Sequence, residues 1–226
     1  MEFMIDTANL EEIEHYNNLI PLSGVTSNPT IVKKEGKIDF YQHMRQIRKI
    51  IGDQTSLHIQ VVATDYEGII KDAKAIVENV DKEVYIKIPV NEAGIQAIKT
   101  LKNEGYHVTA TAVYTKFQAY LAIAANADYI APYYNRMENL NIDPNDLIKE
   151  VSKEIARTNS NSKILGASFK NVKQVNSALE NGAHAATMSV DIIKTALTMS
   201  SIQKAVNDFN KDWESIYGNG LVIADL

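Results

Sequence analysis

The chain has 226 residues, a formal net charge of −5 at pH 7 and 45% hydrophobic residues. This length suits one domain with a sizeable core, and the lack of a basic surplus argues against a nucleic-acid-binding protein. An anionic small substrate is not excluded, because it needs only a few local cations. The absence of cysteine excludes disulfides, thiolate metal sites and a cysteine nucleophile.

No targeting or membrane-spanning segment is expected. The N-terminus runs directly into a short apolar stretch at residues 3–5, without the basic region and long apolar run of a signal peptide. Nowhere does the chain reach the run of about 18 apolar residues that a membrane span requires. These features predict a cytoplasmic protein with neither a membrane nor a nucleic acid as partner.

Short β-rich runs alternate with helical patterns along the chain. Strands are expected at residues 3–6, 23–26, 57–62, 84–88, 107–113, 129–133, 163–168 and 185–189. Between them, apolar residues recur at helical spacing, as at Ile69, Ala73 and Ile76. Asn91 is expected to cap one of these helices, and Asp143 followed by proline marks the start of another.

Eight alternating strand–helix units predict an α/β fold, a (β/α)8 TIM barrel forming a single domain over residues 1–226. An open doubly wound sheet is the nearest alternative, but no Gly-x-Gly-x-x-Gly phosphate loop follows any strand. Residues 200–226 form an extra C-terminal helical tail with one apolar stripe, made of Ile202, Val206, Phe209, Trp213 and Ile216. Two interpretations of the stripe stay open: it covers its own barrel, or it packs on a neighbouring subunit.

Polar side chains stand on the strand positions that should face the barrel axis. In the strand at 84–88, Ile86 and Ile88 are expected to face the helices, so Lys87 points inward. Similar alternation gives six inward polar residues near the C-terminal ends of strands: Asp6, Gln60, Lys87, Thr111, Tyr133 and Ser168, the last sharing the parity of Gly166. Catalytic residues collect at that end of a barrel, and buried unpaired charges are costly without a use or a partner.

Ordinary structural roles compete with this interpretation. A lone lysine in a strand is often a solvated edge residue, although Lys87 is bracketed by apolar residues that make exposure hard to arrange. Asp6 is a possible N-cap for a helix beginning near Asn9. The five histidines show no metal-ligand spacing, so we expect them to be structural and expect no metal or cofactor.

The chemistry that these residues permit is narrow. A lysine in an apolar barrel makes a free amine available near neutral pH, and that amine attacks carbonyls to form an iminium. The iminium accepts electrons from a neighbouring C–C bond as the bond breaks, so no metal is needed. Proton transfer then requires a carboxylate such as Asp6, and a water held by Gln60, Thr111 and Tyr133.

Five segments, taken together, resemble the small transaldolases and fructose-6-phosphate aldolases over nearly the whole chain. They are residues 1–9, 24–29 (GVTSNP), 86–89 (IKIP), 131–136 (APYYNR) and 167–170 (ASFK). The resemblance implies a (β/α) barrel in which Lys87 forms a Schiff base with a dihydroxyacetone unit. It also implies a homo-oligomeric ring, commonly a pentamer or decamer, with the C-terminal helix crossing to a neighbour.

The resemblance further implies roles for individual residues. Asp6 transfers protons, and Thr111 and Gln60 hold the catalytic water, with Tyr133 beside them. Arg136 binds the phosphate of a sugar phosphate substrate. The remaining residues of the substrate-binding set are Thr26, Asn28, Ala131, Ser168 and Lys170.

The family has two branches. Transaldolases pass the dihydroxyacetone unit between sugar phosphates of the pentose phosphate pathway, whereas the aldolase branch forms or cleaves fructose 6-phosphate from free dihydroxyacetone and glyceraldehyde 3-phosphate. Gln60, Tyr133 and Lys170 are all of the aldolase kind, which favours that branch. Ser27 stands where the family usually has threonine, and residues 137–141 lack its usual aspartate and glycines, so acceptor preference is open.

Two further functions compete. A non-catalytic barrel that binds a sugar phosphate is disfavoured because Lys87 and Asp6 are both present with the water-holding set. A phosphosugar isomerase or epimerase on the same fold uses carboxylate, histidine or cysteine bases and has no need of an inward lysine.

Overall fold

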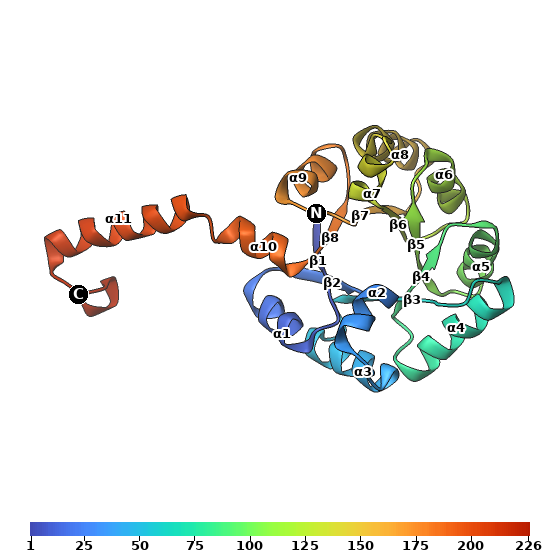
Figure 1. The fold of residues 1–226 in the computed structure, drawn as a ribbon, viewed down its shortest axis with the longest axis horizontal. Helices are drawn as coiled ribbons and strands as arrows, with labels where there is room; N and C mark the ends of the chain where they lie inside the picture. The colour runs from blue at the N-terminus through green and yellow to red at the C-terminus, as the bar shows by residue number, and fades with distance from the viewer. The chain divides into compact units, whose positions relative to one another are not determined.

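The computed structural model describes residues 1–226, which divide into two compact units, Met1–Val190 and Asp191–Leu226. The first unit holds a closed barrel of eight strands in sequence order, each paired in parallel with its neighbours (Figure 1). The strands are β1 Glu2–Asp6, β2 Leu22–Thr26, β3 Ser56–Gln60, β4 Tyr85–Pro89, β5 His107–Val113, β6 Tyr129–Pro132, β7 Lys163–Gly166 and β8 Ala185–Met188. The (β/α)8 barrel predicted from the sequence is therefore confirmed, and the open sheet is excluded.

Helices follow the strands around the barrel. They are α1 Leu10–Leu19, α2 Pro29–Val32, α3 Phe40–Ile51, α4 Tyr66–Asn79, α5 Glu92–Asn103, α6 Lys116–Ala124, α7 Tyr134–Asn139, α8 Pro144–Thr158 and α9 Val172–Glu180, with a 3-10 turn at Lys33–Glu35. None of the helices in the chain is both long enough and apolar enough to cross a membrane.

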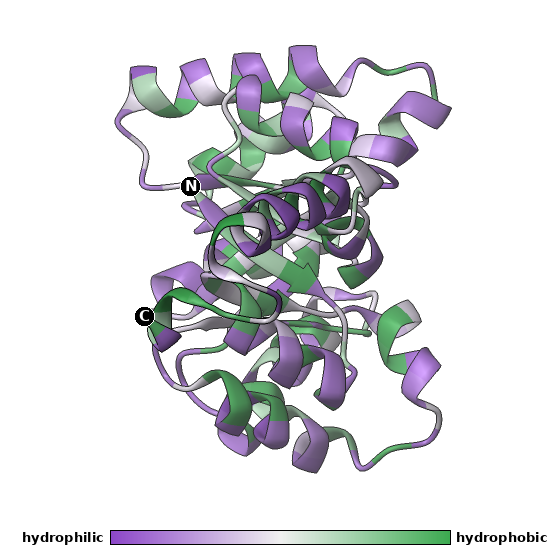
Figure 2. Ribbon diagram, turned by 90° about the vertical axis from the view of Figure 1, so that its left-hand side faces the viewer, coloured by the Kyte–Doolittle hydropathy of each residue, from purple (hydrophilic) through white to green (hydrophobic).

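Side-chain caps fix where several of these helices begin. The Asn91 side chain accepts a hydrogen bond from the Gly94 amide at the start of α5, and Asp143 caps α8 ahead of its proline, both as predicted. Asn9 caps α1 through the Glu12 amide. The alternative role of Asp6 as an N-cap is therefore wrong. Figure 2 shows hydrophilic and hydrophobic residues mixed along the helices. In α4 the buried residues are Ile69, Ala73 and Ile76, the apolar set expected from the sequence.

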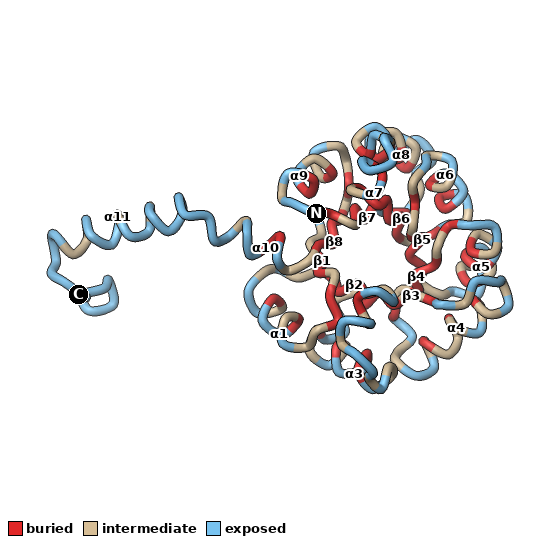
Figure 3. Tube along the Cα trace, viewed as in Figure 1, coloured by how far each residue is buried: buried red, intermediate tan, exposed pale blue.

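The core has two layers, one between strands and helices and one inside the barrel. Figure 3 shows buried residues concentrated on the strands and on parts of the surrounding helices. Ile86 and Ile88 belong to the outer layer and are fully buried. Inside the barrel lies a buried cluster of Met4, Tyr129, Leu165 and Ala185, with Tyr85 packed against it. These side chains fill the barrel interior below the C-terminal ends of the strands.

The second unit consists of α10 Val190–Leu197, which begins on the last residue of the first unit, α11 Ser200–Tyr217 and a 3-10 turn at Ile223–Asp225. α11 begins where the tail was expected and contains no buried residue. The segment after it folds back, since the Trp213 indole donates to the Leu221 carbonyl at 2.8 Å. That the two units form a single domain stays a prediction, as do both interpretations of the apolar stripe.

Candidate active site

Lys87 lies inside the barrel, as its strand parity predicted. The residue is 2% exposed, and its Nζ donates a 3.2 Å hydrogen bond to the backbone carbonyl of Ser27. Gln60 on β3 and Thr109 on β5 are its register partners on the two sides. Lys87 forms no ion pair, so its only polar partner is a neutral carbonyl. No carboxylate therefore has to be displaced before the amine can attack a carbonyl.

Asp6 ends β1 next to Thr26 at the end of β2 and accepts a 2.6 Å hydrogen bond from the Thr26 hydroxyl. That hydroxyl also lies 2.7 Å from the hydroxyl of Thr187 on β8. Thr26 has one proton and gives it to the carboxylate, so Thr187 must be the donor in the second bond. The result is a directed chain from Thr187 through Thr26 to Asp6.

Thr187 was missed by the sequence interpretation, although its parity is that of Ala185 inside the barrel. If the alternation rule had also been applied to the strand at residues 185–189, it would have placed Thr187 inside the barrel.

Thr111 and Tyr133 are brought together as predicted. The Thr111 hydroxyl donates to the Tyr133 hydroxyl at 3.1 Å, and both residues are buried. Tyr133 packs in an apolar cluster with Ala131 and Ala167, which is supported by the neighbouring Ala112. Two hydroxyls are thus held in contact near the C-terminal ends of β5 and β6, an arrangement able to bind a water.

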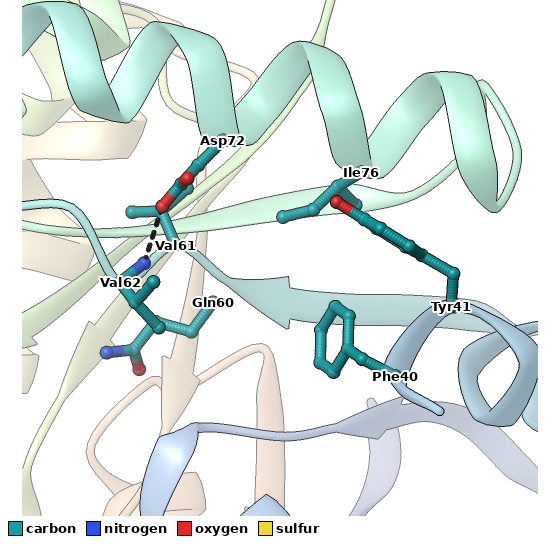
Figure 4. Close-up of a pocket in the computed structure, with 7 residues that line it drawn as sticks. All are labelled: Phe40, Tyr41, Gln60, Val61, Val62, Asp72 and Ile76. Carbon is teal, nitrogen blue, oxygen red and sulfur yellow. Dashed lines mark hydrogen bonds between the residues drawn. The ribbon is translucent and has the colours of Figure 1, made fainter. Parts of the chain in front are cut away.

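Gln60 ends β3, and its side-chain oxygen is buried without a hydrogen-bond partner. Such an oxygen requires a donor, and a water or a substrate hydroxyl supplies one. Beside it lies a cavity of about 230 Å³ lined by Phe40, Tyr41, Gln60, Val61, Val62, Asp72 and Ile76. In Figure 4 the Gln60 carboxamide points away from Phe40 and Tyr41. Gln60 makes no hydrogen bond to Thr111 or Tyr133. What the three residues share is their place at or near the C-terminal ends of their strands.

Arg136 lies on α7, which follows β6 directly. Its guanidinium carbon lies 4.7 Å from the centre of the Tyr133 ring, within the range of a cation–π contact. The side chain is exposed and therefore available to an anion. Lys170 is also exposed, but no contact of its side chain with Arg136 is present. The Asn28 side-chain oxygen caps α2 by accepting hydrogen bonds from the Thr30 and Ile31 amides.

The parity argument for Ser168 is wrong. Leu165 and Ala167 belong to the interior clusters, whereas a Cβ on Gly166 would lie 3.4 Å from Ala178 of α9, so Gly166 faces the helices. β7 ends at Gly166, and Ser168 follows with a left-handed φ of 64°. Its orientation is therefore set by a backbone turn beyond the strand, and strand alternation cannot predict it.

His58 lies below the site and has the structural role that was expected. It is fully buried, stacks on Tyr85 and hydrogen-bonds Thr109 and Ser56. The Ser56 hydroxyl donates its proton to the Ser23 carbonyl, so His58 Nε2 must donate to Ser56 while Nδ1 accepts from Thr109. Burial, with the charges of Lys87 and Arg48, lowers the pKa of His58 to about 3. This ring is therefore neutral near pH 7 and adds no charge beside the lysine.

A buried lysine, a hydrogen-bonded carboxylate and a pair of contacting hydroxyls converge at one end of a closed barrel. Residues 3–221 match the family model for transaldolase/fructose-6-phosphate aldolase. The chain belongs to the transaldolase/fructose-6-phosphate aldolase family. It is also 57% identical to a probable fructose-6-phosphate aldolase of Streptococcus pneumoniae (strain ATCC 700669 / Spain 23F-1), over 213 residues covering 94% of this chain and 96% of that protein.

Family membership confirms the resemblance found in the sequence and makes this protein an enzyme of the aldolase and transaldolase type. The family acts on sugar phosphates, and a lysine Schiff base is its general mechanism. A non-catalytic binding barrel and an isomerase are both disfavoured, because neither explains why a member of this family has a buried lysine inside the barrel.

Proposed function

We propose that this protein is a class I fructose-6-phosphate aldolase, which cleaves fructose 6-phosphate to dihydroxyacetone and glyceraldehyde 3-phosphate or runs the reverse condensation. The hydrogen bond between Thr111 and Tyr133 carries this choice of branch, because it sets a phenol hydroxyl beside the proposed water site. The 57% identity to a probable fructose-6-phosphate aldolase supports the same choice. No cofactor or metal is required.

In the proposed reaction, the Lys87 amine attacks the C2 carbonyl of fructose 6-phosphate and water leaves, which gives an iminium. Asp6 then takes the proton of the C4 hydroxyl as the C3–C4 bond breaks. The electron pair of that bond passes into the iminium to form an enamine, and glyceraldehyde 3-phosphate departs.

The enamine is protonated at C3 by way of the water held by Gln60, Thr111 and Tyr133. Water then hydrolyses the resulting iminium, which releases dihydroxyacetone and restores Lys87. Thr26, Asn28, Ala131 and Ser168 are the proposed donor-side residues.

Phosphate recognition is assigned to Arg136, whose planar guanidinium can grip a phosphate with two parallel hydrogen bonds. Lys170 is proposed to add a second positive charge on the same side. The support for Arg136 is its exposure above the Tyr133 ring, next to the residues proposed for chemistry.

The alternative activity is transaldolase, in which the enamine waits for an acceptor aldose phosphate. Release of dihydroxyacetone from fructose 6-phosphate should be measured with and without erythrose 4-phosphate. Rapid cleavage without the acceptor supports the aldolase. Transfer to erythrose 4-phosphate that is faster than cleavage would make this protein a transaldolase.

We also propose that the protein is a homo-oligomer, a pentamer or decamer, in which the apolar stripe of α11 packs on a neighbouring subunit. Ile202, Val206, Phe209 and Ile216 are 45–74% exposed, which is a large apolar surface for one helix to leave in water. For an enzyme of sugar phosphate metabolism we propose a cytoplasmic location.

A further inference from the structure

A second cavity, of about 330 Å³, opens beside Arg136 and is lined by Tyr114, Arg136, Asn139 and Leu140. Tyr114 is the one aromatic residue in this lining. Neither the strand pattern nor the reaction described above gives it a role. Its hydroxyl nevertheless lies 3.4 Å from Arg136 Nη1, close enough to accept a hydrogen bond from the guanidinium.

Tyr114 reaches this position through an irregularity in β5. Ala112 has a left-handed φ of 56°, and the pairing register with β6 shifts between Ala110 and Val113. A bulge of this kind turns the following side chains to the other face of the strand. Ala112 and Tyr114 consequently pack against the interior cluster that contains Tyr133, on the side that Thr111 faces before the bulge.

Two tyrosines contact the Arg136 guanidinium. Tyr133 offers its face, with the guanidinium carbon 4.7 Å from the ring centre, and Tyr114 stands edge-on to Tyr133 with ring centres 5.8 Å apart. The Tyr114 backbone is itself fixed, because its amide donates to the Gln118 side chain at 2.9 Å. An exposed arginine has many rotamers and loses that freedom when it binds an anion. Contacts that hold it beforehand reduce this loss.

We propose that Tyr114 is a positioning residue that holds the Arg136 guanidinium ready for the phosphate group of the substrate. The inference rests on the proposed function. One N–H of the guanidinium points to the Tyr114 hydroxyl, and the remaining donors stay available for two parallel hydrogen bonds to phosphate oxygens. Because the contact is long, its loss weakens phosphate recognition without abolishing it.

Tyr114→Phe tests the inference, since it removes the hydroxyl and keeps the ring against Tyr133. The KM for glyceraldehyde 3-phosphate in condensation with dihydroxyacetone should rise about threefold to tenfold, which is the effect of an ordinary hydrogen bond and suits a contact as long as this one. The KM for unphosphorylated glyceraldehyde and both kcat values should stay within twofold of wild type. Tyr120→Phe, which removes a phenol hydroxyl from the outer helix α6, is the matched control.

A double-mutant cycle with Arg136→Ala separates positioning from direct contact. If Tyr114 acts through Arg136, Tyr114→Phe should have no further effect on kcat/KM for the phosphorylated substrate once Arg136 is alanine. Additive losses would show that Tyr114 contacts the phosphate by itself, and equal losses with both aldehydes would show a general structural role; either result overturns the inference. A wild-type enzyme that turns over no sugar phosphate would instead refute the proposed function.

Discussion

The Thr26 hydroxyl donates a 2.6 Å hydrogen bond to Asp6 while accepting one from Thr187 at 2.7 Å. Strands β1, β2 and β8 are adjacent in the closed barrel, and each supplies one member of this chain. A carboxylate held in this way has a fixed orientation toward the barrel axis. The chain therefore links barrel closure, which brings β8 beside β1, to the group proposed to move protons.

Removing the first hydroxyl of that chain should slow the reaction. Thr187→Val keeps the shape of the side chain but leaves the Thr26 oxygen without its donor. We expect kcat for fructose 6-phosphate cleavage to fall about fivefold, which corresponds to about 1 kcal/mol for one hydrogen bond. Thr187→Ser retains the hydroxyl and should keep kcat near wild type. Equal kcat in the valine and serine variants would show that the chain does not assist Asp6.

Tyr133→Phe tests the branch choice. The variant removes the hydroxyl that contacts Thr111 and retains the ring beneath Arg136, so phosphate binding and packing should be preserved. Fructose 6-phosphate cleavage should fall by at least about tenfold, the low end for loss of one positioned proton-transfer partner. Transfer to an acceptor aldose should suffer less. Wild-type cleavage rates in this variant would refute the proposed role of the phenol.

The lowered pKa of His58 predicts how the free energy of unfolding depends on pH. Its folded-state pKa of about 3 lies below the value near 6.5 of an exposed histidine, so between these values only the unfolded chain takes up the proton. The free energy of unfolding should fall as pH drops below about 6.5, with a contribution from His58 of up to about 1.4 kcal/mol per pH unit.

Urea unfolding at pH 7.5, 6.0 and 5.0 measures that slope. His58→Gln should show a smaller loss of stability over this range than wild type, whereas His15→Gln, at an exposed position on α1, should show the wild-type loss. The same slope in His58→Gln and in wild type would mean that His58 is not held neutral.

Truncation after Ser200 tests the proposed packing of α11 on a neighbour. The shortened chain should form smaller species than the full chain by light scattering. A substitution in the stripe, Phe209→Asp, should have the same effect, and Asn210→Asp on the same helix should not. A truncated chain of unchanged assembly size would favour the interpretation in which the stripe covers its own barrel.

The sequence predicted the barrel well because each strand is a short apolar run bounded by helix caps, and all eight lie within a few residues of their expected places. Lys87 and Thr111 were predicted to face inward because alternation holds along regular strands. The rule failed at Ser168, which lies beyond the end of β7 and is itself left-handed. It made no prediction for Tyr114, which follows the left-handed Ala112. A backbone turn of this kind at Ala112 and Ser168 has no signature in the residue types, since neither is glycine or asparagine.

Only part of the hydrogen-bond chain that ends on Asp6 could be predicted from the sequence. Thr26 was assigned to the site through the family resemblance. Alternation along β8 can place Thr187 inside the barrel, but its hydrogen bond with Thr26 depends on the closure of β8 against β1. Pairings between the first and last strands depend on barrel closure, which local sequence patterns do not encode.

The proposed Schiff base on Lys87 can be trapped covalently and located in the sequence. Borohydride added to the enzyme with dihydroxyacetone should reduce the iminium to a stable secondary amine and abolish activity. Mass spectrometry of peptides should place the added mass on Lys87, and Lys87→Met should acquire none, while chelators leave the wild-type rate unchanged. An adduct on another lysine, or full activity after borohydride treatment with the substrate present, would show that Lys87 is not the nucleophile.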